Sequence, residues 1–303
     1  MVHNHKPNFA AGLIKIEMKF TIALSTVLLI ANHAFGQLAG DLDLNFNGNG
    51  YVTHDFGFQD NASGVVMQAD QKIIVTGTAL SPSFMGTLKI MRLNQDGSID
   101  SAFADNGVFS FSVTAETYGV ESFVRDDGKI VVGGLAAYNY GYYDILLLRI
   151  NADGSIDSTF GTNGYTIINY STRDDLTQAI TEQPDGKIVV SGTIMDTTVF
   201  KNIPTLLRFN EDGIIDSTFG NNGLMQFPVA EPDNELSSVM VQADGKILAS
   251  GHYQNVFTGA TDFDILMVRT DSSGMPDTAF GTNGMVTTSV NGGIDDAFGM
   301  AID

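Results

Sequence analysis

Short apolar runs separated by turn residues make up almost the whole chain from residue 51 onward. The first four runs lie near 51–56, 62–68, 72–78 and 87–94, and aliphatic residues are frequent in them. Aliphatic and β-branched runs of four to eight residues, bounded by turn residues, are typical of β-strands. The chain beyond residue 40 has no stretch with the apolar period of a helix. The pattern therefore predicts an all-β protein.

The same pattern returns along the chain at a nearly constant interval. The motif Phe46–Gly50 is followed by four similar motifs, at 103–107, 160–164, 219–223 and 280–284. Their closing glycines lie 57, 57, 59 and 61 residues apart. We therefore divide residues 37–303 into four complete copies and the start of a fifth: 46–102, 103–159, 160–218, 219–279 and 280–303.

Two kinds of turn recur at fixed places in each copy. The first is Asp-Gly-Lys between two apolar runs, which occurs at 127–129, 185–187 and 244–246. A two-residue turn that matches the strand twist needs positive φ, which glycine adopts freely. The first copy has Gln71 in place of this glycine, so we expect strain there. The second turn is Asn-x-Asp-Gly-x-x-Asp, which follows a run that ends in arginine; it occurs at 94–100, 151–157 and 210–216 and in altered form at 271–277.

Four strand-length runs in each copy predict one four-stranded antiparallel sheet per copy. Such a sheet buries its apolar faces only when it stacks on a neighbour, and closing the stack radially leaves few exposed edges. We therefore predict a β-propeller-like array of four-stranded antiparallel blades, with four complete repeats and a partial fifth. An open stack of sheets and a β-solenoid are the alternatives, although solenoid coils are usually shorter.

These signals together resemble a known repeat family. Residues 148–164 read Leu-Arg-Ile-Asn-Ala-Asp-Gly-Ser-Ile-Asp-Ser-Thr-Phe-Gly-Thr-Asn-Gly, and this stretch with the Asp-Gly-Lys turn resembles the delta-60 repeat of secreted bacterial proteins over residues 40–303. Asn47, Ala104 and Gln71 depart from its glycines. The resemblance implies a propeller-like fold and an exported protein that sometimes carries a C-terminal sorting domain. It implies no catalytic activity and supplies no functional residues.

The N-terminal region reads as an export signal. In residues 18–36 a lysine precedes the apolar run Phe20–Ala31, and a small-x-small site ends at Gly36. A membrane anchor and a buried helix are the alternatives, but the apolar run is shorter than the roughly 20 residues that span a bilayer. We expect a signal peptide at 18–36, with residues 1–17 as an upstream extension, and an extracellular or outer-surface location.

The last copy stops early. Residues 299–303 align with 64–68, inside the second apolar run of a copy. A chain end there would leave an unpaired strand edge, which natural sheets avoid. We therefore expect that this sequence is a fragment and that it does not fix the number of blades.

Charge and cysteine content exclude several classes of function. The chain has 15 Lys and Arg against 35 Asp and Glu, for a net charge of −20, and its basic residues are scattered. Nucleic-acid binding needs a basic stripe that neutralises phosphates, so we expect no nucleic-acid partner. We also expect no integral membrane segment in the mature chain. There is no cysteine, so disulfides and thiolate chemistry are excluded.

Two sets of repeated polar residues are candidate sites. Asn94, Asp96 and Asp100, with their copies, could supply the front of a calcium loop; alternatively they cap their own turns, and no carboxylate stands at position 12. The arginines Arg92, Arg149, Arg208 and Arg269 could form a ring of anion ligands. A residue repeated once per copy favours a structural role instead, in which each arginine pairs with a neighbouring aspartate.

The loops between the third and fourth runs differ from copy to copy. They lie at 81–86, 138–143, 195–203 and 253–262, and the second is rich in tyrosine (Tyr138-Asn-Tyr-Gly-Tyr-Tyr143). Variable loops on a rigid scaffold are typical of binding sites for an extracellular protein or glycan, although neutral drift predicts the same variation. Asp-Ser-Thr and similar triplets after each Asn-x-Asp-Gly turn also resemble an O-glycosylation motif.

Catalysis is the class that this sequence favours least. Beyond the leader the only histidines are His54 and His252, in different copies, so a Ser-His-Asp arrangement would need a long-range fold-back. We therefore predict a non-catalytic structural, adhesion or binding module and assign no catalytic, cofactor or metal residues. The alternatives are an extracellular hydrolase or lyase on the same scaffold and a spacer for a domain beyond residue 303.

Overall fold

The computed structural model describes residues 40–138, 141–229, 232–255, 262–290 and 293–301. Leu42–Asp303 form one compact unit. The signal peptide predicted at 18–36, the extension at 1–17 and parts of two variable loops lie outside the described residues. Within the described part of the chain no helix is long and apolar enough to span a bilayer.

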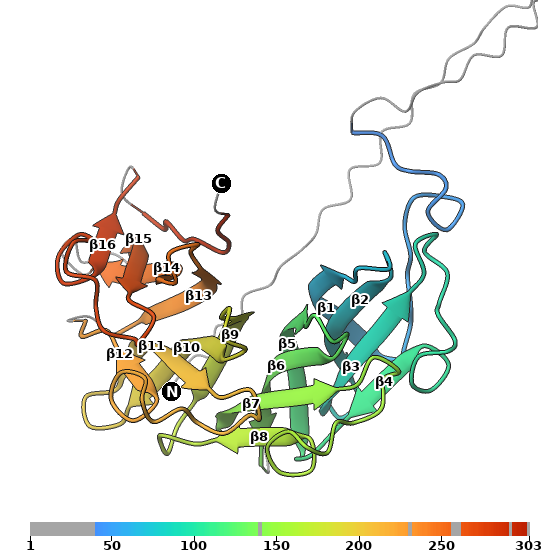
Figure 1. The fold of residues 1–303 in the computed structure, drawn as a ribbon, viewed down its shortest axis with the longest axis horizontal. Helices are drawn as coiled ribbons and strands as arrows, with labels where there is room; N and C mark the ends of the chain where they lie inside the picture. The colour runs from blue at the N-terminus through green and yellow to red at the C-terminus, as the bar shows by residue number, and fades with distance from the viewer. Residues whose placement is uncertain (1–39, 139–140, 230–231, 256–261, 291–292, 302–303) are drawn as a thin grey trace, which may run out of the picture. The chain divides into compact units, whose positions relative to one another are not determined.

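The described residues form four separate antiparallel sheets of four strands each, and none of them is helical (Figure 1). The first sheet contains β1 (Gln59–Met67), β2 (Ile73–Leu80), β3 (Gly86–Leu93) and β4 (Val108–Phe111), and the second contains β5 (Glu116–Val124), β6 (Ile130–Ala137), β7 (Tyr143–Ile150) and β8 (Tyr165–Ile168). The third contains β9 (Asp175–Glu182), β10 (Ile188–Asp196), β11 (Lys201–Phe209) and β12 (Leu224–Gln226), and the fourth contains β13 (Asn234–Val241), β14 (Ile247–Asn255), β15 (Asp262–Thr270) and β16 (Met285–Thr288). The predicted all-β class and the four-stranded sheets are confirmed.

The sheets are out of phase with the copies assigned from the sequence. The fourth strand of each sheet comes after the Phe-x-x-x-Gly motif and so belongs to the following copy: β4 pairs with β3 from Leu88↔Phe111 to Met91↔Val108. The strand predicted at 51–56 is therefore wrong, because these residues have no regular secondary structure. They occupy the sequence position of a fourth strand, but the third strand with which they would pair is not among the described residues.

Every first strand carries a β-bulge opposite a glycine of the second strand. The register shifts lie at Ala62/Gly64, Gly119/Glu121, Ser191/Gly192 and Leu236/Ser238. A Cβ on Gly192 would lie 1.8 Å from the Leu176 carbonyl oxygen, and one on Gly77 would lie 2.1 Å from that of Asn61. A bulge brings the two backbones this close, and only glycine tolerates the approach. The glycine inside each second strand is thus fixed by the bulge.

The departures from the repeat's glycines are all in left-handed backbone. Gln71 has φ 66°, where Gly128, Gly186 and Gly245 stand in the other three turns at φ 80° to 82°. Ala104 and Asn47 have φ 45° and 51°. Residues with a Cβ rarely adopt this region, so the strain expected at Gln71 is confirmed.

Neighbouring sheets pack face to face through aliphatic side chains. Ile74, Leu88 and Ile90 of the first sheet pack on the second. The opposite face of the second sheet packs on the third through Val131 and Leu147, and equivalent contacts join the third sheet to the fourth. Each inner sheet is therefore covered on both faces, as the stacked-repeat prediction requires.

Candidate functional site

The ends of the sheets form two rims with different chemistry. One, the repeat rim, carries the Asp-Gly-Lys turns and the Asn-x-Asp-Gly turns of every copy. The other, the variable rim, carries the loops that join second to third strands and the connections from each sheet to the next. In antiparallel sheets these two sets of connections lie at opposite strand ends, so the two groups of predicted sites are separated by the length of the strands.

The repeat rim holds a buried ion-pair cluster in every copy. In the second copy Arg149 Nε lies 2.7 Å and Lys129 Nζ 2.9 Å from the same Asp157 Oδ2. Burial opposes ionisation of this carboxyl, but hydrogen bonds from Thr159, Lys129 and Arg149 outweigh it and hold the pKa of Asp157 far below its ordinary value. The equivalent clusters are Arg92–Asp100–Lys72, Arg208–Asp216–Lys187 and Arg269–Asp277–Lys246. Structural pairing of the arginines is confirmed.

The same arginines also bind the next sheet. Arg149 Nη1 donates to the carbonyl oxygen of Glu211 over 2.6 Å, and its guanidinium lies 4.7 Å from the centroid of the Phe160 ring. Arg92 donates likewise to the carbonyl of Ala152, and Arg208 to that of Ser272. An arginine that is planar and always charged can meet a carboxylate, a carbonyl and an aromatic face at once. These residues are thus the joints between sheets and are not anion ligands.

The Asn-x-Asp-Gly turns give their polar side chains to the turn itself. Asp96 Oδ1 accepts hydrogen bonds from the Ser98 amide (2.9 Å) and the Ser98 hydroxyl (2.6 Å), and these bonds lower the pKa of Asp96. The Asp100 carboxylate is held by Arg92 and Lys72. Among the described residues no three His, Asp or Glu side chains gather as metal ligands. The turn-capping interpretation fits these contacts, and calcium binding by these turns stays an untested alternative.

The variable rim exposes aromatic side chains around one cation. The Arg173 guanidinium lies 4.6 Å from the centroid of the Tyr142 ring and 5.9 Å from that of Phe200, and Arg173 Nη1 donates to the Tyr142 hydroxyl. Tyr142 is 44% and Phe200 62% exposed. The three come from different connections, in the second and third copies. We call Tyr142, Arg173 and Phe200 the aromatic cluster; cation–π contact orders these three side chains without burying the aromatic pair.

The tyrosine-rich loop predicted at 138–143 divides into exposed and inward residues. Tyr138 is exposed, and residues 139 and 140 lie outside the described chain. Tyr143 points inward: its hydroxyl and that of Tyr118 both donate to Glu116 Oε2, over 3.3 and 2.6 Å. Burial raises the pKa of both phenols. Tyr143 is therefore a structural residue, and Tyr138 and Tyr142 remain as surface candidates.

Acidic groups gather around His252 in the fourth sheet. His252 Nδ1 lies 3.3 Å from Asp296 Oδ2, and Glu235 stands directly opposite His252 in the register of β13 and β14. Burial raises the pKa of Glu235, although the nearby His252 opposes the shift. Sequence reasoning missed this group, because Asp296 belongs to the next copy and its approach depends on the fold. His54 is in the first copy, against Phe56, so the two histidines are apart as predicted.

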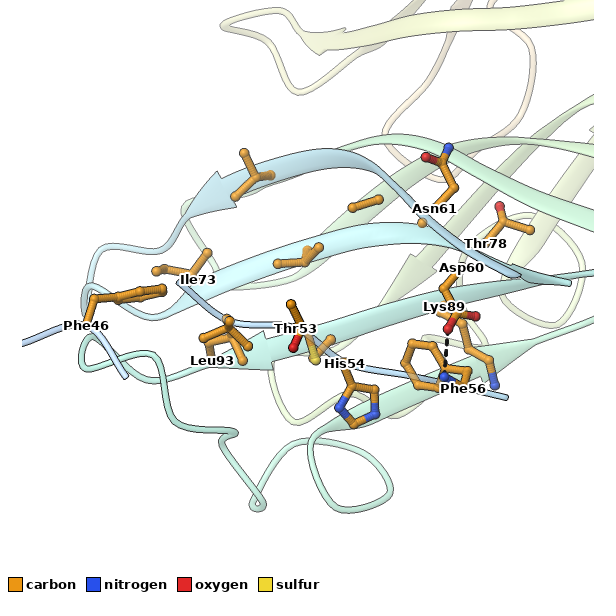
Figure 2. A pocket seen from close by; sticks show the side chains of 16 residues that line it. Phe46, Thr53, His54, Phe56, Asp60, Asn61, Ile73, Thr78, Lys89 and Leu93 are labelled. Atoms are coloured by element: carbon orange, nitrogen blue, oxygen red, sulfur yellow. Dashed lines mark hydrogen bonds between the residues drawn. The ribbon is translucent and has the colours of Figure 1, made fainter. Parts of the chain in front are cut away.

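An apolar cleft of about 480 Å³ lies on the first sheet (Figure 2). Its lining includes Val52 and Phe56 from the segment before β1 and Val65, Ile73 and Val75 from β1 and β2. Figure 2 shows Phe56 at one end, where its amide donates to Asp60 Oδ2 over 2.7 Å. Most of the lining is apolar, and Thr53, His54, Asp60, Asn61, Thr78 and Lys89 are its polar members, so the cleft is suited mainly to apolar contact. No motif in the sequence marks it.

Comparison with known proteins finds one family. Residues 68–103, 125–160, 183–219 and 242–280 match a family model described as "Domain of unknown function (DUF5122) beta-propeller". Four separate segments of the chain are thus similar to this beta-propeller repeat model. Each matched segment runs from the Asp-Gly-Lys turn to the phenylalanine that packs under the arginine, so the DUF5122 match follows the residues of the repeat rim.

Two further comparisons add little to the DUF5122 match. A solved structure titled "glucose dehydrogenase" is similar with a TM-score of 0.41 and 10% sequence identity, over 78% of this chain and 87% of that one. At this level of similarity the likeness carries no argument about activity. Comparison with curated protein sequences gave no match.

Proposed function

We propose that this protein is an exported, non-catalytic β-propeller-type module that binds an extracellular glycan or protein through its variable rim. The single observation that carries the proposal is the aromatic cluster, in which two exposed rings flank one arginine on loops that differ between copies. Exposed aromatic rings provide apolar area with a polar tip, which suits sugar faces and protein surfaces.

The repeat rim supports the same proposal, because few of its charged side chains are free to bind a ligand. Its arginines, lysines and aspartates are engaged with one another and with neighbouring sheets. Side chains that are already paired contribute little to binding because their contacts would first have to be broken. Binding specificity is therefore assigned to the variable rim, where each copy contributes different residues.

The binding test compares matched substitutions on the two rims. Tyr142→Ala and Phe200→Ala are compared with Ile214→Ala, which removes a side chain 57% exposed on the repeat rim. We expect binding to an array of extracellular polysaccharide fragments to weaken by about tenfold or more in the first two variants and to be unchanged in the third. If the parent protein binds no fragment on the array, the same variants are compared by cross-linking to partners on the surface of the native host. Equal binding by all three variants, in either arm, would sink the proposal.

Export is tested separately. The apolar run at 20–31 and the small residues before Gln37 support cleavage after Gly36. We expect the mature protein, recovered outside the cytoplasm of its native host, to begin at Gln37 by intact mass. A protein that keeps residues 18–36 and stays inside the cell would contradict the exported role and leave the binding test unaffected.

A hydrolase or lyase is a second candidate, favoured by one observation. His252, Asp296 and Glu235 place an imidazole beside a carboxylate and a buried acid of raised pKa, which are the groups that general acid–base catalysis uses. Turnover on a polysaccharide and lactone panel that is lost in both His252→Gln and Glu235→Gln would favour this candidate. We expect no turnover.

A further inference from the structure

The segment Tyr51–His54 occupies the position of a fourth strand. It follows the motif Phe46–Gly50 at the same distance as β4, β8 and β16 follow theirs. Each of those strands pairs with the third strand of the sheet that precedes its motif. Within the described residues Tyr51–His54 is in no sheet. The equivalence indicates that Tyr51–His54 corresponds to a fourth strand whose three partner strands are not among the described residues.

The face of the first sheet beside this segment lacks the cover that its equivalents have. Val65 is 72% exposed, whereas the residues at its position in the other sheets, Ser122, Ile180 and Val239, are 7%, 5% and 8% exposed. Those three are covered by the preceding sheet. Exposed aliphatic side chains at positions that are otherwise buried are typical of an interaction surface. The apolar cleft of Figure 2 is the space where the preceding sheet would lie.

The loop before the segment is already docked on the first sheet. The Asn47 amide donates to the Asp96 carbonyl over 2.6 Å, as the Ala104 amide donates to Asp153 (2.8 Å) and the Gly161 amide to Asp212 (2.6 Å). Phe46 borders the cleft. The loop that contains Phe46 and Asn47 therefore already makes the backbone contact that connects neighbouring sheets in the other copies. This contact holds Tyr51–His54 beside the first sheet.

The same joint provides a place for an arginine. In each described sheet the arginine of the third strand rests on the phenylalanine of the motif that follows it, and Arg92, Arg149 and Arg208 also donate to the carbonyl of the second residue of the next Asn-x-Asp-Gly turn. In the first of these joints Arg92 stacks on Phe103 at 4.5 Å and donates to the Ala152 carbonyl over 2.6 Å. Phe46 and the carbonyl of Gln95 hold these two positions on the first sheet. A partner that fits the cleft would therefore present an aliphatic sheet face and one arginine.

We propose that this cleft is the docking site for the first three strands of one further repeat of the same kind. Tyr51–His54 would pair with the third of these strands, and the strand-end arginine would stack on Phe46 and bond to the Gln95 carbonyl. A second copy of this chain does not fit, because its last sheet already has its own fourth strand, β16, and its own Phe280 loop. The place that this loop would take on the Asp96 turn is held by Asn47.

The test supplies the three strands within one chain. A copy of residues 175–216, which contains β9, β10, β11 and the arginine-bearing joint, is inserted immediately before Leu44 in the otherwise complete chain. The protein has no cysteine, so Val65→Cys provides a single thiol on the cleft. We expect thiol labelling to slow by about tenfold or more on insertion, and the amides of 52–54 to become protected from hydrogen exchange.

Two controls make the result specific. The same insertion with the copied Arg208 changed to Ala is expected to lose much of the protection, and an insertion of equal length made of glycine and serine is expected to give none. Protection of the amides in β10 shows that each chain is folded. Equal labelling with and without the copied strands would overturn the proposal. Protection in the chain without an insertion, together with a dimer in sedimentation, would make a second copy the occupant and would overturn it too.

Discussion

The two rims use their polar residues in opposite ways. On the repeat rim each complete copy places the same arginine, lysine and aspartate in one ion-pair cluster, and the arginines of the first three copies also bond to the next sheet. On the variable rim the loops differ, and acidic groups are buried with fewer partners: Oδ1 of Asp175 and of Asp264 have no hydrogen-bond partner among the described residues. The residues that recur in every repeat thus connect the strands and sheets, and the proposed binding function is assigned to the rim where the repeats differ.

The largest effect is expected from breaking one joint of the repeat rim. Arg149→Met leaves the Asp157 carboxylate buried with one cation fewer and removes the bond to Glu211. We expect the free energy of unfolding in urea to fall by about 3 kcal/mol. The matched change Arg269→Met, at a side chain that is 21% exposed, is expected to cost less. Equal stability of Arg149→Met and the parent protein would refute the structural role.

A slightly smaller effect is expected at the bulge. A Cβ on Gly192 would meet the Leu176 carbonyl oxygen at 1.8 Å, so Gly192→Ala must push the two backbones apart. We expect a loss of about 2 kcal/mol in the free energy of unfolding. Gly299→Ala is the control, since a Cβ there meets nothing within 4 Å. A stable Gly192→Ala variant would show that the bulge is not a fixed feature of the sheet.

Acidic groups on the two rims are expected to contribute to folding stability with opposite pH dependence. The pKa of Asp157 is lowered on folding, so its contribution to stability is present above the ordinary carboxyl pKa, about 4, and is lost as pH falls through the lower folded value. The pKa of Glu235 is raised, so its contribution is lost as pH rises. Urea midpoints at pH 7, 5 and 3 should depend less on acid in Asp157→Asn than in the parent protein. A steeper acid dependence in that variant would reverse this assignment.

Substitutions in the aromatic cluster should leave stability unchanged. Tyr142→Ala and Phe200→Ala remove exposed rings, and the expected change in the free energy of unfolding is within about 0.5 kcal/mol. A loss above about 2 kcal/mol would mean that the cluster stabilises the fold. The proposal that the variable rim serves binding would then lose its main support.

The smallest effect is expected from calcium. The side chains of the Asn-x-Asp-Gly turns are held by Ser98, Arg92 and Lys72 and by their equivalents. We expect the melting temperature to be the same in calcium and in chelator. A rise of several degrees in calcium would show that the turns open to bind the ion, and the repeat rim would then have a ligand of its own.

Local signals in the sequence predicted most of the scaffold. The strand-length runs, the Asp-Gly turns and the spacing of Phe46–Gly50 and its copies gave the all-β class, one four-stranded sheet per repeat and the left-handed backbone at Gln71. An arginine repeated once in every copy indicated structural pairing with a neighbouring aspartate, and the contact of Arg149 with Asp157 confirms it. These features depend on neighbours close in sequence, which is why periodicity could find them.

Features that join residues from different copies were beyond that reasoning. The assignment of Tyr51–Phe56 as a strand failed because a fourth strand needs a partner from the repeat before it. The bond from Arg149 to Glu211, the meeting of His252 with Asp296, and the stacking of Arg173 between Tyr142 and Phe200 all cross long stretches of chain.

The sequence by itself determined the repeat, its strands and turns, and the acidic, cysteine-free character that disfavours nucleic-acid binding and excludes disulfides. The tertiary structure alone decided the phase of the sheets, the role of each arginine as a joint between neighbours, and the open face of the first sheet. The physical reason is that hydrogen bonding in turns and strand alternation act over a few residues, whereas burial and the pairing of edges depend on which sheet lies alongside.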